Sequence, residues 1–251
     1  MEDPEDQDRI VFFTEVRPGS VYPVVVAMHG QPPRGKAPRD YRFAPSVLAE
    51  VLPMVERGEV RPFVLVLPIF RFQGQNWPGF DLAEFRQKLD DLLAGEGIAS
   101  EGYYLFGHSG AAGCGGDGMN RALRLAPKGA GFLDTCLGAG FRRAVRELHA
   151  ANIPTILLHA VETAGFVPRQ AFEYSSRFDF GRAYEPLGLV PAECPADRPD
   201  VALRDQPYRC SHTPDLVVRA FVVDTGEGEP AHEEALRVGT RYFLRTMLAT
   251  R

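Results

Sequence analysis

The sequence has no run of basic residues and no apolar run long enough to span a membrane. Its 251 residues include 28 Lys and Arg against 33 Asp and Glu, so the formal net charge is −5. Without a basic stretch, we do not expect nucleic acid or anionic membrane surfaces as main partners, and we expect no transmembrane span. The acidic opening, residues 1–6, lacks the apolar core of a signal peptide, so we expect no secretory signal in the chain as given.

Cysteine is also scarce, and the four that occur do not have the spacing of metal ligands. No Cys-x-x-Cys pair is present, so we expect no metal site. Two interpretations stay open. Four free thiols would fit a cytoplasmic enzyme, whereas a disulfide between Cys194 and Cys210 would close a loop rich in Pro and charge and leave Cys114 and Cys136 free. That disulfide would indicate an oxidising compartment, secreted or periplasmic.

Internal repeats and low-complexity tracts are absent, and the composition is that of an ordinary globular domain. Hydrophobic residues make up 45% and charged residues 24%, and the length suits one large domain over residues 1–251. Apolar strand-like runs alternate with helical patterns, which predicts a mostly parallel sheet flanked by helices. The expected strands are 9–16, 22–28, 62–70, 103–108, 131–136, 153–161 and 216–224, and the expected helices are 44–55, 82–93, 119–126, 141–150 and 231–248.

Residues 163–215 interrupt this alternation. The segment is rich in Pro, Arg and aromatic residues and contains no confident helix or strand. It falls between the last two expected strands, so it should lie over or beside the carboxyl edge of the sheet. A structureless segment of this length inside a compact domain is unusual and is often functional. We interpret it as an insertion that either shapes a substrate site or forms an irregular surface elaboration.

One stretch indicates chemistry. The apolar run that begins at Tyr103 ends at Ser109, and the helix-like segment 119–126 follows. This order is typical of a nucleophile elbow, in which a strand delivers a serine to a sharp turn at the carboxyl edge of the sheet and a helix leaves from it. The turn leaves space only for small residues two positions before and after the serine, as Gly107 and Ala111 are. We therefore predict a catalytic serine, with a structural turn serine as the alternative.

From about Val21 to its C-terminus, the sequence resembles the α/β-hydrolase superfamily through this Gly-x-Ser-x-small motif. The last place of the motif is usually Gly, and Ala111 is a mild departure. The resemblance implies an α/β-hydrolase fold and hydrolysis through an acyl-enzyme with Ser109 as nucleophile. It implies no cofactor and no metal. A carboxylic ester is the expected substrate, and the alternatives left open are an amide or peptide, acyl transfer, and a non-catalytic binding protein.

The resemblance also indicates which residues would activate the serine. A histidine follows the last strand in this superfamily, and His232 comes after the expected strand 216–224, at the start of the closing helix. The carboxylate that would orient this histidine stays open. Asp134 lies at the carboxyl end of an apolar strand. Glu162 is the acid nearest to the usual position, where Thr163 stands here.

An oxyanion needs preorganised N–H donors, and two loops are candidates to supply them. Gly110 follows the nucleophile, so its amide is one expected donor. His29-Gly30-Gln31 resembles the His-Gly oxyanion loop of the superfamily, so Gln31 or Gly30 would supply the second amide, with His29 beside the substrate. Trp77, the only tryptophan, stands near two Gln and an Asn. We predict either a polar, aromatic wall for substrate there or a plain packed loop.

Overall fold

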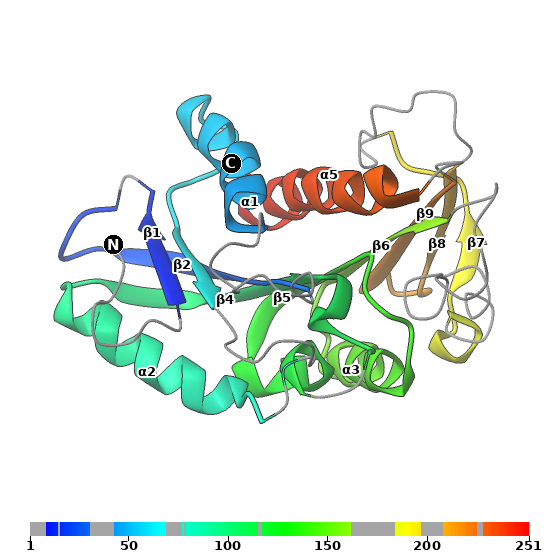
Figure 1. The fold of residues 1–251 in the computed structure, drawn as a ribbon, viewed down its shortest axis with the longest axis horizontal. Coiled ribbons are helices and arrows are strands. Elements are labelled where there is room, and N and C mark those ends of the chain that lie inside the picture. Colours follow the sequence, from blue (N-terminus) through cyan, green and yellow to red (C-terminus); the bar gives the residue numbers. More distant parts are fainter. Residues whose placement is uncertain are drawn as a thin grey trace.

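The computed structural model describes residues 9–14, 16–30, 43–68, 77, 79–114, 117–161, 184–196, 208–224 and 228–250. Within these residues, one nine-stranded sheet has the order β1-β3-β2-β4-β5-β6-β9-β8-β7 (Figure 1). Its strands are β1 Arg9–Phe13, β2 Val21–Met28, β3 Val64–Pro68, β4 Ala99–His108, β5 Pro127–Leu133, β6 Thr155–Val161, β7 Val190–Ala192, β8 Tyr208–His212 and β9 Val218–Asp224. The helical elements are α1 Phe43–Glu56, α2 Leu82–Gly95, η2 Ser109–Ala111, η3 Gly118–Leu125, α3 Ala139–Ala150, η4 Glu185–Leu187 and α5 Gly228–Leu248.

The middle of the sheet is parallel, as the alternation of strands and helices predicts. Strands β3, β2, β4, β5, β6 and β9 pair in parallel, while β1, β8 and β7 join the two edges in antiparallel fashion. Helices α1 and α5 cover one face, and α2 and α3 cover the other (Figure 1). None of the described helices is long and apolar enough to cross a membrane.

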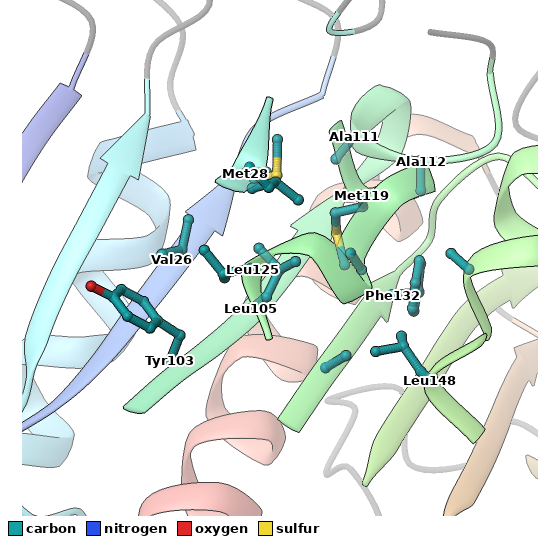
Figure 2. Packing of buried hydrophobic residues seen from close by; sticks show 14 of the residues in the cluster. Val26, Met28, Tyr103, Leu105, Ala111, Ala112, Met119, Leu125, Phe132 and Leu148 are labelled. Atoms are coloured by element: carbon teal, nitrogen blue, oxygen red, sulfur yellow. The ribbon is translucent and has the colours of Figure 1, made fainter. Parts of the chain in front are cut away.

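Two hydrophobic layers fix this arrangement. Successive side chains of a strand point to opposite faces, so Val24, Val26 and Met28 of β2 join one cluster, while Val25 and Ala27 join the other. The first cluster packs under α2, η3 and α3, and Figure 2 shows part of it around Met119 and Phe132. The second packs β2, β3 and β4 against α1 and α5. The two layers therefore bury both faces of the sheet and leave the ends of its strands outside them.

The element expected after the serine differs from the prediction. Residues 109–111 and 118–125 form two short 3₁₀ segments, η2 and η3, with a kink at Arg121, instead of one regular helix. Glycine occupies 110, 113, 115, 116 and 118 in this stretch. Because glycine loses more conformational freedom in a helix than any other residue, the chain does not propagate an α-helix directly from the serine.

The segment 163–215 is also more regular than its composition suggests. Its described part contains η4 and the strands β7 and β8, which extend the sheet beyond β9. No confident helix or strand was expected in this segment, and the two strands that form there are short. β7 has three residues and β8 has five, and β8 pairs with β9 across the short connection 213–217. The residues 162–183 and 197–207 lie outside the described part of the chain.

The four cysteines form two bridges, Cys114–Cys136 and Cys194–Cys210, each with Cα atoms 5.1 Å apart. The pairing of Cys194 with Cys210 agrees with the sequence-based alternative, and the expectation that Cys114 and Cys136 are free was wrong. Cys136 follows β5, and Cys114 follows the turn after β4. Because β4 and β5 are parallel neighbours, the segments that leave their carboxyl ends meet at the same edge, which the sequence separation of 22 conceals.

This pairing makes a direct prediction. The denatured, unreduced protein should contain no titratable thiol, and four should appear after reduction. Each bridge should stabilise the fold by roughly 3 kcal/mol, because it closes a loop that would otherwise add entropy to the unfolded chain. Thiol titration with Ellman's reagent, followed by mass mapping of the linked peptides, checks both bridges separately. Two free thiols mapped to Cys114 and Cys136 would contradict the first bridge.

Candidate active site

Ser109 occupies a strained turn at the carboxyl end of β4. Its φ is +56°, in the left-handed region that non-glycine residues rarely adopt, and it is 3% exposed. The turn is tight around it. A Cβ on Gly107 would lie 2.2 Å from Met119 Sδ and 2.7 Å from Ala111 Cβ, so only glycine fits there. Steric crowding thus explains why small residues stand two positions before and after the serine.

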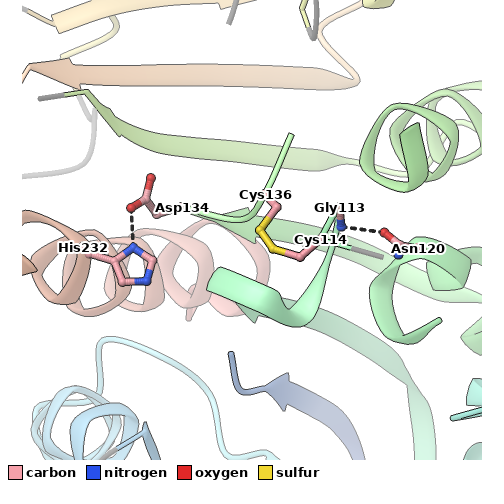
Figure 3. The surroundings of a disulfide bond; sticks show 6 residues. All are labelled: Gly113, Cys114, Asn120, Asp134, Cys136 and His232. Atoms are coloured by element: carbon pink, nitrogen blue, oxygen red, sulfur yellow. Dashed lines mark hydrogen bonds and ion pairs between the residues drawn. A yellow bond between two sulfur atoms is a disulfide. The ribbon is translucent and has the colours of Figure 1, made fainter. Parts of the chain in front are cut away.

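A histidine and a carboxylate meet at the same edge of the sheet. His232, in the N-terminal part of α5, has its Nδ1 2.5 Å from Oδ2 of Asp134, which directly follows β5 (Figure 3). A carboxylate oxygen accepts, so Nδ1 carries the proton and donates it. This leaves the lone pair of the ring on Nε2. Asp134 is buried, 4% exposed, whereas the His232 side chain keeps 24% of its surface exposed.

The backbone around Asp134 holds its carboxylate in place. Oδ1 accepts a hydrogen bond from the Ala160 amide at 2.9 Å, and the Asp134 amide donates to the Leu158 carbonyl at 2.6 Å. Both partners belong to β6, the next parallel strand. Asp134 itself has φ +46°, so Ser109 and Asp134, at the ends of adjacent strands, are both left-handed non-glycine residues. Such conformations persist only where the surroundings impose them, and they cluster at functional sites.

His108 connects this pair to the serine. Its ring lies 4.1 Å from the His232 ring, centroid to centroid, and its Nε2–H donates to the His232 carbonyl at 2.9 Å. His108 directly precedes Ser109, so these contacts bring the start of α5 to the elbow. Burial lowers the pKa of His108 well below its usual value, which keeps the ring neutral beside His232. The sequence offered no signal for this contact, because the two histidines are 124 positions apart.

The predicted oxyanion loop approaches the serine from β2. A Cβ on Gly30 would lie 2.4 Å from Ser109 Cβ and 2.8 Å from its Oγ, so the Gly30 backbone packs directly against the serine side chain. Gly110 directly follows Ser109 inside η2 and is buried. Gln31 and Glu162, the other residues predicted from the sequence, lie outside the described part of the chain.

Trp77 and His29 have a supporting position beside this loop. Trp77 is 1% exposed, and its Nε1–H donates to the His29 carbonyl at 2.9 Å. The two rings lie 4.7 Å apart, and His29 Nδ1–H donates to the Gly30 carbonyl at 2.6 Å. The sequence left a substrate wall and a packed loop open for Trp77, and the buried indole favours the packed loop. A buried tryptophan needs a partner for its N–H, and the backbone beside the elbow supplies it.

His159 and Tyr184 form a second buried pair near Asp134. His159 of β6 is fully buried, and its Nδ1 lies 2.6 Å from the Tyr184 hydroxyl. Burial lowers the pKa of His159 to about 4 and raises that of Tyr184 well above its usual value, so both are neutral near pH 7. Tyr184 belongs to the 163–215 segment and packs on Phe141 as well. The described part of that segment is thus anchored to the strand that carries the Asp134 contacts.

The buried histidines predict how stability depends on pH. Burial lowers the pKa of both His29 and His159 to about 4, below the value of roughly 6.5 in an unfolded chain. Between these values the unfolded state binds more protons than the folded state, so stability is full above about pH 6.5 and falls as pH decreases towards 4. Each group contributes at most about 1.4 kcal/mol per pH unit.

Urea denaturation at about pH 7 and about pH 5 measures this loss, in a range above the titration of most carboxylates. The His159→Gln variant should show a smaller loss between the two pH values than the native protein, because one of the titrating groups is gone. An unfolding free energy that is equal at both pH values would contradict the prediction.

Comparison with solved structures identifies the fold of this chain. No family model and no curated protein matches the chain. A solved thermostable esterase is 16% identical with a TM-score of 0.54, and the match covers 100% of this chain and 62% of that one. A feruloyl esterase module from Clostridium thermocellum is 11% identical, with a TM-score of 0.51 and coverages of 99% and 92%. A ferulic acid esterase from Anaeromyces mucronatus is 12% identical, with a TM-score of 0.51 and coverages of 95% and 84%.

The chain matches only part of the length of two of these solved structures. The chain spans 62% of the thermostable esterase and 58% of an uncharacterised protein from Capnocytophaga ochracea, which is 13% identical with a TM-score of 0.52. At such identities the likeness concerns the fold alone. The parallel sheet, the helices on both faces and these neighbours together give one conclusion: the chain has the α/β-hydrolase fold, the fold of solved esterases.

Proposed function

We propose that this protein is a serine hydrolase that cleaves carboxylic esters through an acyl-enzyme. One observation supports the proposal above all others. The hydrogen bond between His232 and Asp134 lies beside the left-handed turn that holds Ser109, and His108 packs the ring of His232 next to that turn. A serine, a histidine and a carboxylate on neighbouring strand ends form the constellation that activates a hydroxyl.

Each residue has one role in the proposed reaction. Ser109 Oγ attacks the ester carbonyl while Nε2 of His232 takes the hydroxyl proton. The same proton then goes to the departing alcohol oxygen as the C–O bond breaks, which leaves an acyl group on Ser109. Water attacks this acyl-enzyme by the same route, releases the acid and restores the serine. Asp134 keeps the Nδ1 proton in place and stabilises the imidazolium.

The negative oxygen of the tetrahedral intermediate requires N–H donors on the other side of the serine. We assign the Gly110 amide as one donor and an amide of the Gly30–Gln31 segment as the other. The close approach of Gly30 to Ser109 supports this assignment. The bonds that Trp77 and His29 make to this backbone would keep it rigid, so the donors would need little rearrangement during the reaction.

Asp134 is our choice for the acid over Glu162. Its Oδ2 contacts His232 and its Oδ1 accepts from the Ala160 amide, so both oxygens are engaged in the geometry that orients an imidazole. Substrate class and location are assigned from the solved esterases and the two disulfides. The esterases with the same fold support an ester over an amide, and two disulfides support an oxidising compartment, periplasmic or extracellular.

The first functional prediction concerns the nucleophile. Ser109→Ala should lower ester hydrolysis by several orders of magnitude, because the members of a triad act as a unit. Hydrolysis of p-nitrophenyl acetate, p-nitrophenyl butyrate and methyl ferulate measures the loss and compares acyl groups. A fluorophosphonate probe should label the native protein at Ser109 and leave the variant unlabelled. Equal turnover by the variant would contradict the serine mechanism.

The second functional prediction separates the two candidate acids. Asp134→Asn should lower kcat by on the order of 10⁴, because the amide can donate to Nδ1 and stabilise the wrong tautomer. Glu162→Gln is the matched control and should change kcat by less than about threefold. Circular dichroism checks that both variants fold. A larger loss in Glu162→Gln than in Asp134→Asn would transfer the role to Glu162.

A further inference from the structure

The Cys114–Cys136 bridge lies next to the Asp134–His232 pair of the candidate active site (Figure 3). Cys114 belongs to the loop that leaves Ser109, and Cys136 belongs to the loop that leaves Asp134. In Figure 3 the bridge joins these two loops beside the Asp134–His232 hydrogen bond. The other bridge, Cys194–Cys210, lies at β7 and β8, at the edge of the sheet. The chain therefore has one disulfide at the site and one away from it.

The two loops touch through their backbones. A Cβ on Gly113 would lie 1.7 Å from the Cys136 carbonyl oxygen, and a Cβ on Gly138 would lie 2.1 Å from the Gly113 carbonyl oxygen. The Gly113 amide donates to Asn120 Oδ1 at 2.7 Å, which anchors the first loop to η3 (Figure 3). Glycine has no side chain, so side-chain packing at Gly113 and Gly138 cannot hold the two loops together. The covalent bond between the sulfur atoms keeps the two backbones together.

Both loops begin at a strained residue. Ser109 has φ +56° and Asp134 has φ +46°. The described residues after Ser109 are 3₁₀ or irregular up to β5, and the segment after Asp134 is irregular up to α3. A left-handed non-glycine residue is unfavourable and remains only where its surroundings determine it. The bridge ties the segment after one strained residue to the segment after the other, so each turn limits the freedom of its neighbour.

We propose that the Cys114–Cys136 disulfide positions the site: it holds the serine turn and the Asp134–His232 pair in their productive geometry. This inference rests on the proposed ester hydrolysis. Neither sulfur takes part in the reaction, so the cysteines are positioning residues. A displacement of about 1 Å between nucleophile and base can cost on the order of 10² in rate. Loss of the bridge should therefore lower kcat and leave KM almost unchanged.

The experiment compares two double variants. Cys114→Ser/Cys136→Ser removes the bridge at the site, and Cys194→Ser/Cys210→Ser is the matched control that removes the distant bridge. With p-nitrophenyl butyrate we expect kcat to fall at least about tenfold in the first variant, with KM within about threefold. In the control, kcat should remain within about twofold. Circular dichroism and thermal unfolding show whether each variant is folded at the assay temperature.

A second route tests the same bridge if the first variant does not fold. In the Cys194→Ser/Cys210→Ser protein, Cys114–Cys136 is the one remaining disulfide. Dithiothreitol reduces it to two thiols and is itself oxidised to a cyclic disulfide. Activity should fall as thiols appear, before the circular dichroism signal of the fold is lost, and it should return after reoxidation. Full activity with both thiols exposed to titration would overturn the proposal.

A measurement that needs no turnover separates this inference from the proposed function. A proton held between His232 Nδ1 and Asp134 gives a low-field proton resonance, which Asp134→Asn should abolish. This resonance should broaden or vanish when Cys114–Cys136 is removed and persist in the control variant. If it behaves so while the native protein neither hydrolyses esters nor reacts with a fluorophosphonate, ester hydrolysis is wrong and the positioning role stands. If removal of the bridge changes neither the resonance nor kcat, the positioning role is wrong.

Discussion

The hydrogen bond between His232 and Asp134 is the interaction around which the rest of the site is arranged. It ties the beginning of α5 to the end of β5, and the Ala160 amide on β6 holds the other carboxylate oxygen. This bond can form because β5, β6 and β9 are parallel, so the segments that follow β5 and β9 leave the same edge of the sheet. Two hydrophobic layers bury the faces of that sheet. The polar side chains that can contact one another are therefore those at the strand ends.

Glycine sets how closely the segments of the site approach. Gly107 admits Met119 and Ala111 beneath the serine turn, and Gly30 admits the serine side chain against the loop after β2. The same property that allows these approaches prevents an α-helix from starting directly after the serine. The loop that leaves Ser109 therefore depends on other constraints, and a disulfide to the loop after Asp134 is one of them.

Buried histidines surround the site and remain neutral. Desolvation by burial lowers the pKa values of His29, His108 and His159, and each ring makes a hydrogen bond to a carbonyl or a hydroxyl group. Neutral rings add shape and directed hydrogen bonds without adding positive charge beside His232. Through Tyr184, one of them also joins the 163–215 segment to β6. The segment is thus connected to the strand that supports Asp134.

Local patterns in the sequence were sufficient for the parallel sheet, most element positions and the serine turn, because strand alternation, helical periodicity and the small residues around Ser109 are properties of neighbouring positions. The residues that surround this serine could not be predicted in the same way. The sequence left Asp134 and Glu162 open, missed the contact of His108 with His232, and treated Cys114 and Cys136 as free. Each of these depends on which strands lie side by side, and the strand order becomes defined only when the whole sheet packs between its helices. The burial of Trp77 has the same origin, since a loop tryptophan is exposed or enclosed according to the elements that fold over it.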